Sequence, residues 1–319
     1  MSQYVNKQAS KQLDIIIVSY NTAEYTKRAI QSIYDETTQT SFNIIVVDNN
    51  SPDNSVNLIR KNFPDITLIE SKENLGFAAG VNLGAKATNS EYILLLNPDT
   101  LILDGAIDKI MHFSKQKNDA GIWGGVTLNN DRSLNSNNAR AKLSFRTLLF
   151  SALGLSKAFR SSCFFNHDNY GCWDRNSIRE VDVITGCFFL TTRSLWEKLQ
   201  GLDDTFFMYA EEADYCIRAI AIGHQPIVTP DARIIHHGGV SEANFSGKMI
   251  KLLKGKSELI NKHTKRWKQP LFKKLLLMHV INKVLFYNVL VLLKRDRKSL
   301  LMEWQIIFQQ RHVWLKGYR

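Results

Sequence analysis

Short, uninterrupted apolar runs recur along the first hundred residues and constrain the fold more than any other feature of the chain. The runs lie at 13–19, 42–48, 66–70 and 91–97. Helical stretches separate them, at 23–34, at 56–62 and after a glycine-rich start at 74–80. A strand that is apolar throughout is buried on both faces, as in a parallel sheet covered by helices on both sides. The alternation therefore predicts an α/β fold with a doubly wound, mainly parallel sheet.

Polar residues stand where three of these predicted strands end. Ligands of a parallel sheet bind beyond the carboxyl ends of its strands. The residues at those ends are Tyr20 and Asn21, Asp48 and Asn49, and Asn97 and Asp99. This layout predicts a ligand site along one edge of the sheet.

Beyond residue 99 the alternation becomes looser. Residues 129–178 are rich in Asn, Ser and Arg and match no regular pattern. A strand-like run follows at 181–193, then a helix with acidic residues in its first turn, and a pair of strands at 226–239. The sequence thus predicts the elements after residue 180 and leaves 129–178 unassigned.

Charge divides the chain into two parts. Of the 41 basic and 30 acidic residues, 18 and 3 lie in 248–319, which leaves 23 and 27 for 1–247. The first part is therefore mildly acidic, with a net charge of −4, and the second strongly basic, at +15. We expect a catalytic or binding domain at 1–247 and a basic helical region at 248–319. Such a region suits an anionic membrane surface or a nucleic acid, the alternative being a solvated helical surface.

The most apolar stretch of the basic region, 275–293, is a candidate for contact with lipid. Lys283 lies near its middle, and a central lysine costs about 2.5–3.5 kcal/mol on insertion. We therefore expect interfacial helices rather than a membrane-spanning one. The aliphatic and aromatic residues are too dense for a plain phosphate-binding arm and no reader motif occurs, so no nucleic-acid partner is expected.

Cysteine use and the N-terminus bear on the compartment. The four cysteines, at 163, 172, 187 and 216, contain no C-x-x-C pair, so neither a disulfide framework nor a zinc knuckle is expected. This predicts a reducing compartment. The polar N-terminus lacks the apolar core of a secretion signal.

Single residues near the strand ends suggest a metal site and a nucleoside contact, and each residue also has a purely structural explanation. A lone carboxylate at Asp99, after the rigid Pro98, suits one Mg²⁺ or Mn²⁺ that completes its shell with phosphate oxygens and water. The alternative is that Asn97-Pro98-Asp99 is a simple turn. Asp48 could accept a hydrogen bond from a nucleobase imide or a ribose hydroxyl, or cap the next helix.

Two clusters lie later in the chain. Glu211, Glu212 and Asp214 are close in sequence, and crowded like charges raise at least one pKa, which suits a general base. The alternative is that they complement the dipole of a solvated helix. His236 opens a His-His-Gly-Gly turn, where an imidazole is suited to a metal or a phosphate.

Together these segments resemble the family 2 glycosyltransferases of the GT-A fold, especially the rhamnosyltransferase-like enzymes of bacterial surface polysaccharide assembly. The matching segments, in the family's order and spacing, are IIIVSYN, VVDNNSPDNS, ENLGFAAGVNLG, YILLLNPDT, VITGCFFLTTR, FFMYAEEADYCIRAIAIG and PDARIIHHGGVS. The resemblance implies a Rossmann-like, mixed but mainly parallel sheet flanked by helices. It also implies inverting transfer of a sugar, rhamnose first, from a dTDP or UDP donor to a glycan or lipid-linked acceptor.

On the donor side, the resemblance assigns roles to the first strand ends. It implies that Tyr20, Asn21 and Asp48 hold the nucleoside. Asn74 and Gly76 would line the nucleotide or its sugar.

The resemblance also implies a metal site. Asp99 stands at the family's D-x-D carboxylate, which holds Mn²⁺ or Mg²⁺, and His236 matches the family's H-x-G-G position beside the metal and diphosphate. Asn97 replaces the first carboxylate of D-x-D, so the site has one carboxylate fewer.

For catalysis, the resemblance implies that Glu212 is the general base that deprotonates the acceptor hydroxyl. Glu211 competes for this role, because the usual residue at the position of Glu212 is Asp. Asp214 and Arg218 complete the helix pattern and would position acceptor or base. We expect a cytoplasmic enzyme, peripheral to the inner face of the membrane; a non-catalytic nucleotide-sugar or glycan-binding protein on the same fold is the alternative.

Overall fold

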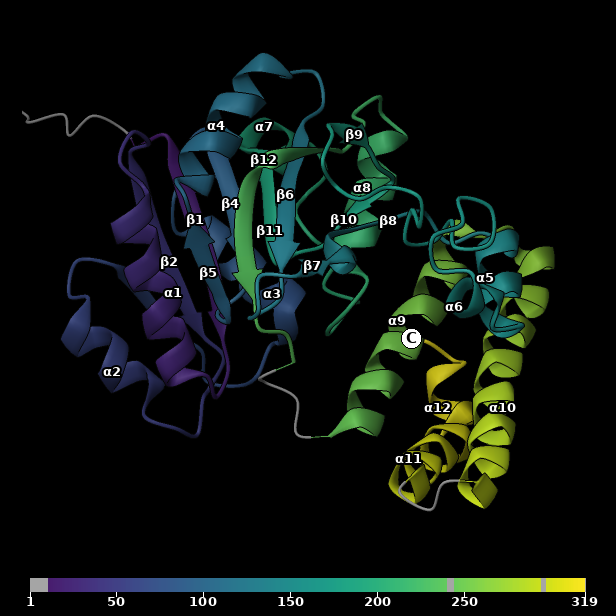
Figure 1. The fold of residues 1–319 in the computed structure, drawn as a ribbon. Helices are drawn as coiled ribbons and strands as arrows, with labels where there is room; N and C mark the ends of the chain where they lie inside the picture. The colour runs from purple at the N-terminus through teal and green to yellow at the C-terminus, as the bar shows by residue number, and fades with distance from the viewer. Residues whose placement is uncertain (1–10, 240–243, 294–296, 319) are drawn as a thin grey trace, which may run out of the picture.

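The computed structural model describes residues 11–239, 244–293 and 297–318, and its first half alternates between strands and helices (Figure 1). The elements are β1 (Leu13–Ser19), α1 (Ala23–Glu36), β2 (Phe42–Asp48), α2 (Ser55–Asn62), β3 (Thr67–Glu70), α3 (Gly76–Lys86), β4 (Tyr92–Leu96), β5 (Thr100–Leu103), α4 (Ala106–Gln116) and β6 (Ile122–Leu128). The strands and helices predicted before residue 100 are confirmed. Residues 1–10, and Ser241 of the last matching segment, lie outside the described residues.

The strands form one mixed sheet in the order β3-β2-β1-β4-β11-β6-β12-β5. The first four strands are parallel to their neighbours, and β6 and β12 (Ile227–His236) also form a parallel pair. The exceptions are β11 (Phe188–Thr192), antiparallel between β4 and β6, and β5, antiparallel to β12. The predicted mixed, mainly parallel sheet is confirmed.

The expected pair of strands at 226–239 is wrong, because the structure has the single strand β12 there. Its pairing with β6 shifts register between Val228 and Arg233. Pro230 lies inside this interruption, and proline has no N–H to donate to a ladder, so it is tolerated at such a bulge.

Both faces of the sheet are buried, as the apolar runs predicted. On β1, Leu13, Ile15 and Ile17 belong to a core with residues of α1 and α4. The alternate residues Ile16 and Val18 face a second core that includes α3. The period of two along a strand thus sends successive side chains into different cores.

Residues 129–178, which no pattern assigned, form short elements held by polar contacts. They are β7 (Leu134–Asn135), η1 (Ser136–Asn138), β8 (Ala139–Arg140), α5 (Phe145–Ala152) and α6 (Leu155–Ala158). The buried Arg175 guanidinium donates hydrogen bonds to the backbone carbonyls of Ser136, Asn169 and Trp173. Side chain to backbone bonds of this kind leave no apolar periodicity in the sequence, which is why the segment could not be assigned.

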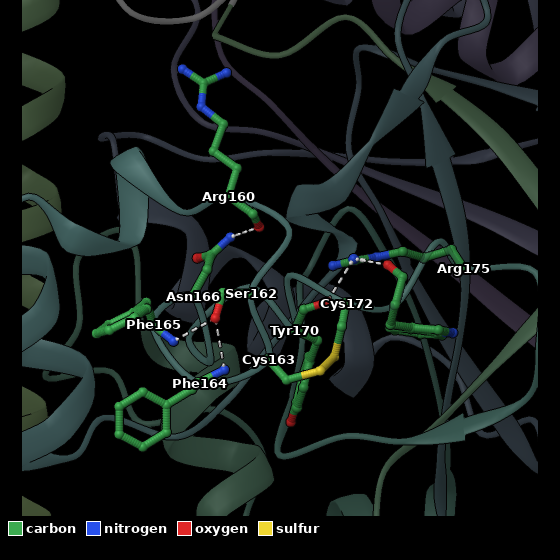
Figure 2. Close-up of a disulfide and its surroundings, with 10 residues drawn as sticks. Arg160, Ser162, Cys163, Phe164, Phe165, Asn166, Tyr170, Cys172 and Arg175 are labelled. Atoms are coloured by element: carbon green, nitrogen blue, oxygen red, sulfur yellow. Dashed lines mark hydrogen bonds between the residues drawn. A yellow bond between two sulfur atoms is a disulfide. The ribbon is translucent and has the colours of Figure 1, made fainter.

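A disulfide joins Cys163 and Cys172 within this segment, a pairing that the cysteine spacing did not predict (Figure 2). Figure 2 shows how the chain doubles back around the bond: the Asn166 amide donates to the carbonyl of Arg160 at 2.7 Å. The Gly171 N–H donates to the carbonyl of Asn166 at 2.9 Å. These turns bring the two cysteines together although they are nine residues apart. The pairing also removes the support that cysteine use gave to a reducing compartment.

The region between the unassigned segment and the tail contains β9 (Arg179–Glu180), β10 (Val183–Ile184), α7 (Arg193–Lys198) and α8 (Glu211–Ile220). Strand β10 pairs with β8 in a separate two-stranded sheet. Helix α8 is the predicted helix with an acidic first turn, and its presence is confirmed.

The tail is helical, as predicted, and packs against the rest of the chain. Its elements are α9 (Phe245–His263), η2 (Arg266–Lys268), α10 (Gln269–Leu293), α11 (Lys298–Gln309) and α12 (Arg311–Trp314). Figure 1 shows these helices gathered beside α5 and α6 at one end of the sheet. They share a core with α5, in which Leu148, Leu253, Leu276, Trp304 and Trp314 are buried.

Helix α10 is buried along its first half and exposes apolar side chains along its second half. Its first half supplies buried residues such as Leu276 and Val280, whereas Leu285, Val289 and Leu292 in its second half are exposed. Among the described residues, the helical stretch Arg266–Leu293 is the one long and apolar enough to cross a membrane, with 17% of its most apolar window buried. Length and composition alone give weak support to a membrane-spanning helix. The cost of inserting Lys283, near the middle of the apolar stretch, still argues against one.

Candidate active site

The ends of β1 and β2 are joined through Ser51. The Ser51 N–H donates to Asp48 Oδ2 at 2.9 Å, and the Asn21 N–H donates to Ser51 Oγ at 3.0 Å. Asp48 is buried, yet its Oδ1 has no hydrogen-bond partner among the described residues. Asp48 therefore does not cap α2, whose N-cap is Asn54: one carboxylate oxygen holds the turn at Ser51, and the other is left to accept a hydrogen bond from a ligand. Tyr20, partly exposed, follows the same strand end.

The start of α3 lies against the loop that precedes α8. Asn74 Oδ1 accepts from the Gly76 N–H at 3.0 Å, and the Asn49 amide donates to the Gly76 carbonyl at 2.8 Å. Gly76 has φ +77°, and a Cβ at this position would lie 2.1 Å from the carbonyl oxygen of Phe207. Only glycine allows this approach, so Gly76 connects the donor side of the sheet to the loop that leads to the acidic cluster.

Asn97, Asp99 and His236 come together at the ends of β4 and β12. His236 Nε2 lies 3.3 Å from Asp99 Oδ1 and 3.2 Å from Asn97 Nδ2. The Gly238 N–H donates to Asp99 Oδ2 at 2.9 Å. The carboxylate, amide and imidazole proposed as one site are thus neighbours in space, although 139 residues separate Asn97 from His236.

The electrostatics of this group favour a charged pair. Burial raises the pKa of Asp99, but the hydrogen bond and charge of His236 and the Gly238 N–H outweigh it, so the pKa lies below its ordinary value. Burial lowers the pKa of His236, while Cys187 and Asp99 outweigh this and raise it to about 10. Within the described ranges, no group of three or more His, Cys, Asp or Glu side chains is arranged to hold a metal.

Glu211 and Glu212 begin α8 directly after a strained turn. Tyr209 and Ala210 have φ of 70° and 79°, the left-handed region that non-glycine residues rarely occupy. Such strain persists where the surroundings impose it, and it clusters at functional sites. Glu211 is 4% exposed, and its Oε2 has no partner in the part of the chain that the structure describes.

Both glutamates have raised pKa values. Burial raises the pKa of Glu211 well above its ordinary value, and the charge of Glu212 adds to this. Burial also raises the pKa of Glu212, with backbone hydrogen bonds and the charge of Arg140 opposing it. The acidic cluster is therefore enclosed rather than solvated, and carboxyl groups with raised pKa values suit a general base.

Asp214 lies within a cage of basic groups. Its carboxylate contacts Arg218 Nε, Lys262 Nζ and His263 Nε2, each at 2.7 Å. These partners hold the pKa of Asp214 well below its ordinary value although burial alone would raise it. Asp214 is fully buried with its oxygens occupied, so its surroundings fit the positioning role rather than direct contact with an acceptor.

Sequence patterns missed the groups that surround the acidic cluster. Arg140 lies in the unassigned segment, and Lys262 and His263 lie in the tail, where only a membrane or solvent contact was expected. No local signal marks them, because they reach α8 only through tertiary packing. No hydrogen bond or ion pair between described residues joins Glu211 or Glu212 to Asp99. Gly76 and Phe77 instead connect the loop before α8 to the start of α3.

The sheet, its polar strand ends and the flanking helices are those of a GT-A glycosyltransferase. Residues 14–217 match the family described as Glycosyl transferase family 2. The chain belongs to this family, as the resemblance predicted.

Relatives and solved structures agree with this assignment. The chain is 23% identical over 249 residues to an N-acetylglucosaminyl-diphospho-decaprenol L-rhamnosyltransferase of Mycobacterium tuberculosis, covering 70% of this chain and 76% of the relative. It is 28% identical over 245 residues to the low-salt glycan biosynthesis hexosyltransferase Agl10 of Haloferax volcanii, covering 73% and 69%. The mannosyltransferase PcManGT from Pyrobaculum calidifontis, solved with GDP-Man and Mn²⁺, shares the fold with a TM-score of 0.60 at 14% identity, covering 97% and 88%.

Proposed function

We propose that the protein is an inverting glycosyltransferase that moves a sugar, rhamnose first, from a dTDP or UDP donor to a lipid-linked or growing surface glycan. The observation that supports it most directly is the enclosed pair Glu211 and Glu212, with raised pKa values, at the start of a helix in a family 2 chain. The mycobacterial relative, by its name, transfers rhamnose to a lipid-linked acceptor.

Asp48 is the proposed anchor for the nucleoside. Its unpartnered Oδ1 would accept the imide N–H of thymine or uracil, and Tyr20 and Asn21 would flank the base. Asn74 and Gly76 hold the start of α3 in place beside them. Thymine and uracil present the same imide edge, so Asp48 would accept either donor.

Asp99 and His236 are the proposed protein ligands of a divalent ion, Mn²⁺ or Mg²⁺. The donor types suit such an ion: a carboxylate and an imidazole, with Asn97 beside them, and the imidazole would give up the proton that pairs it with Asp99 when the ion binds. Two protein ligands are what these hard ions accept when phosphate oxygens and water complete the shell. When bound, the ion would neutralise the charge that develops on the leaving nucleotide diphosphate.

Glu212 is the proposed general base. Glu212 is partly exposed as a residue whereas Glu211 is buried, and on this ground we assign the contact with the acceptor to Glu212. It would take the proton of the acceptor hydroxyl while that oxygen attacks the anomeric carbon in line, which inverts the configuration. Burial keeps the pKa values of both glutamates high. Asp214, fixed by the tail, would hold the helix in position.

The acceptor places the enzyme at a membrane. We propose that it acts at the cytoplasmic face of the cell membrane, where anionic lipids attract basic segments by about 1 kcal/mol per Lys or Arg near the surface. The exposed apolar residues Leu285, Phe286 and Val289 of α10 would contact the lipid interface.

Nucleotide binding tests the donor site. Ligand binding raises the melting temperature by mass action, so dTDP, UDP, GDP and CMP are each added with and without Mn²⁺. The proposal predicts a metal-dependent shift with dTDP or UDP, which Asp48→Asn reduces. No shift with any nucleotide would contradict it. A shift that occurs without any transfer to lipid-linked acceptors would favour the alternative, a nucleotide-sugar-binding protein.

A further inference from the structure

A small cavity lies between α5, α9 and α10, away from the strand ends. Its volume is about 230 Å³. Its apolar wall includes Leu148, Leu253, Leu275 and Leu276, and its polar residues include Arg140 and Lys256. A cavity that combines an aliphatic wall with basic groups suits a ligand with an apolar chain and an anionic end.

Lys256 is the basic group of the cavity that lacks a direct partner. It is partly buried in the cavity wall, and the structure gives its ammonium no hydrogen bond or ion pair among the described residues. Arg140, by contrast, lies 3.8 Å from Asp168, which also lines the cavity. Burial lowers the pKa of His279 to about 4, so this third basic side chain is neutral at pH 7. Burial lowers the pKa of Lys256 and the charge of Asp168 opposes this, so a bound anion would supply the direct partner that this ammonium lacks.

Two connections place the cavity beside the candidate base. The charge of Arg140 in the cavity wall acts on Glu212. Gly255, the neighbour of Lys256, packs on the strained turn before α8: a Cβ there would lie 2.5 Å from the Tyr209 carbonyl oxygen. A ligand in the cavity would thus have its anionic end next to the acidic cluster.

Helix α10 connects the cavity to the exposed apolar surface. Leu275 and Leu276 line the cavity, and further along the same helix Leu285, Val289 and Leu292 are exposed. Residues ten positions apart on a helix are separated by about 15 Å. An aliphatic chain that leaves the cavity along α10 would therefore stay in contact with apolar side chains.

We propose that this cavity binds the lipid end of the acceptor, with the phosphate at Lys256 and Arg140 and the first part of the isoprenoid chain against the leucines of α5, α9 and α10. This inference rests on the proposed function, which it deepens by locating the acceptor's anchor. The tail would then contribute α9 and α10 to the acceptor site, in addition to its proposed contact with the lipid interface.

Calorimetry with three probes tests the cavity in the full chain. The probes are farnesyl diphosphate, farnesol, which lacks the phosphates, and inorganic diphosphate, which lacks the chain. Titrations are done without divalent metal and with saturating UDP. We expect farnesyl diphosphate to bind at least about tenfold more tightly than either fragment, and Lys256→Met to weaken it by about tenfold, as for loss of one charge-assisted hydrogen bond.

Matched variants complete the test. Lys274→Met removes the same charge from an exposed position of α10 and should leave the affinity within about twofold of wild type. Leu276→Trp should fill the cavity and weaken binding without changing its charge. Wild-type affinity in Lys256→Met, equal binding of farnesol, or displacement of farnesyl diphosphate by UDP would each overturn the proposal. A chain that binds farnesyl diphosphate through Lys256 but no nucleotide would instead contradict the proposed function alone.

Discussion

Lys262 of α9 lies 2.7 Å from the Asp214 carboxylate of α8, so the basic tail is fastened to the helix that begins with the candidate base. The same lysine pairs with Asp203 in the loop before α8, and the Tyr318 hydroxyl donates to the Met208 carbonyl at 2.5 Å. The tail therefore supports the catalytic loop in addition to any contact with lipid.

Lys262→Met should destabilise the fold and slow transfer. It leaves Asp214 buried with two of its basic partners instead of three, and removing one member of a buried ion pair costs up to about 3–5 kcal/mol. Because Arg218 and His263 remain, we expect about 1–3 kcal/mol. Denaturant unfolding measures the free energy, and Lys265→Met, an exposed lysine nearby, is the control. Equal stability of the two variants would show that the Lys262 contact contributes nothing.

Gly76→Ala should disrupt the contact between α3 and the loop at Phe207. The new Cβ would meet the Phe207 carbonyl oxygen, and the left-handed backbone would be strained as well. Gly154→Ala is a matched control, because Gly154 has a similar φ of +74° with nothing within 4 Å. The strain alone costs about 1 kcal/mol, so Gly76→Ala should lose clearly more stability than Gly154→Ala, and nucleotide affinity with it. Thermal unfolding with and without UDP gives both quantities.

The acid limb of the pH–rate profile should lie above the ordinary glutamate pKa of 4.5. A raised pKa means that the base is protonated, and activity lost, at a higher pH than usual. Glu211, whose pKa is raised further by the charge of Glu212, is neutral while Glu212 titrates, so Glu211→Gln should leave the limb nearly unchanged. Arg140→Met removes a positive charge and should move it to higher pH. An acid limb of kcat/KM that Arg140→Met leaves unmoved or moves to lower pH would contradict the assignment.

The same raised pKa values have a consequence for stability. A carboxyl group whose folded pKa lies above its unfolded pKa favours the folded state at low pH, and this stability is lost as the pH rises from the unfolded to the folded pKa. The buried Glu211 should therefore destabilise the protein at neutral pH. We expect Glu211→Gln to unfold at a higher denaturant concentration than wild type at pH 7 and to differ less at pH 4.5. A lower midpoint at pH 7 would contradict the raised pKa.

The exposed half of α10 should hold the protein on membranes. Phe286→Asp with Val289→Asp places two charges on an exposed apolar surface and should release the protein from vesicles that contain anionic lipid. Vesicle flotation measures this, and Ile222→Asp, an exposed apolar residue of the catalytic part, is the control. Truncation of 248–319 is a poorer test, because it would also remove Lys262 and His263 from Asp214.

Sequence patterns predicted the parts of the fold in which one side chain type repeats at a fixed spacing. The apolar strands before residue 100 are of this kind, as are the acidic start of α8 and the helical tail. The proximity of Asp99 and His236 was implied by the resemblance to the family rather than by a pattern around either residue. What could not be predicted depends on contacts between distant segments: the network of Arg175 in 129–178, the disulfide of Cys163, and the cage around Asp214.

The role of Glu212 as general base of an inverting transfer is tested most directly by the activity of Glu212→Gln together with the anomeric configuration of the product. Wild type, Glu212→Gln and Glu211→Gln are each given dTDP-rhamnose and UDP-sugars with a lipid-linked acceptor, and nucleotide affinity is measured in parallel. We expect wild type to give a product with inverted anomeric configuration. We expect Glu212→Gln to lose about 10²–10⁴-fold in kcat with nucleotide affinity unchanged. A product that retains the donor's configuration, or wild-type kcat in Glu212→Gln, would contradict it.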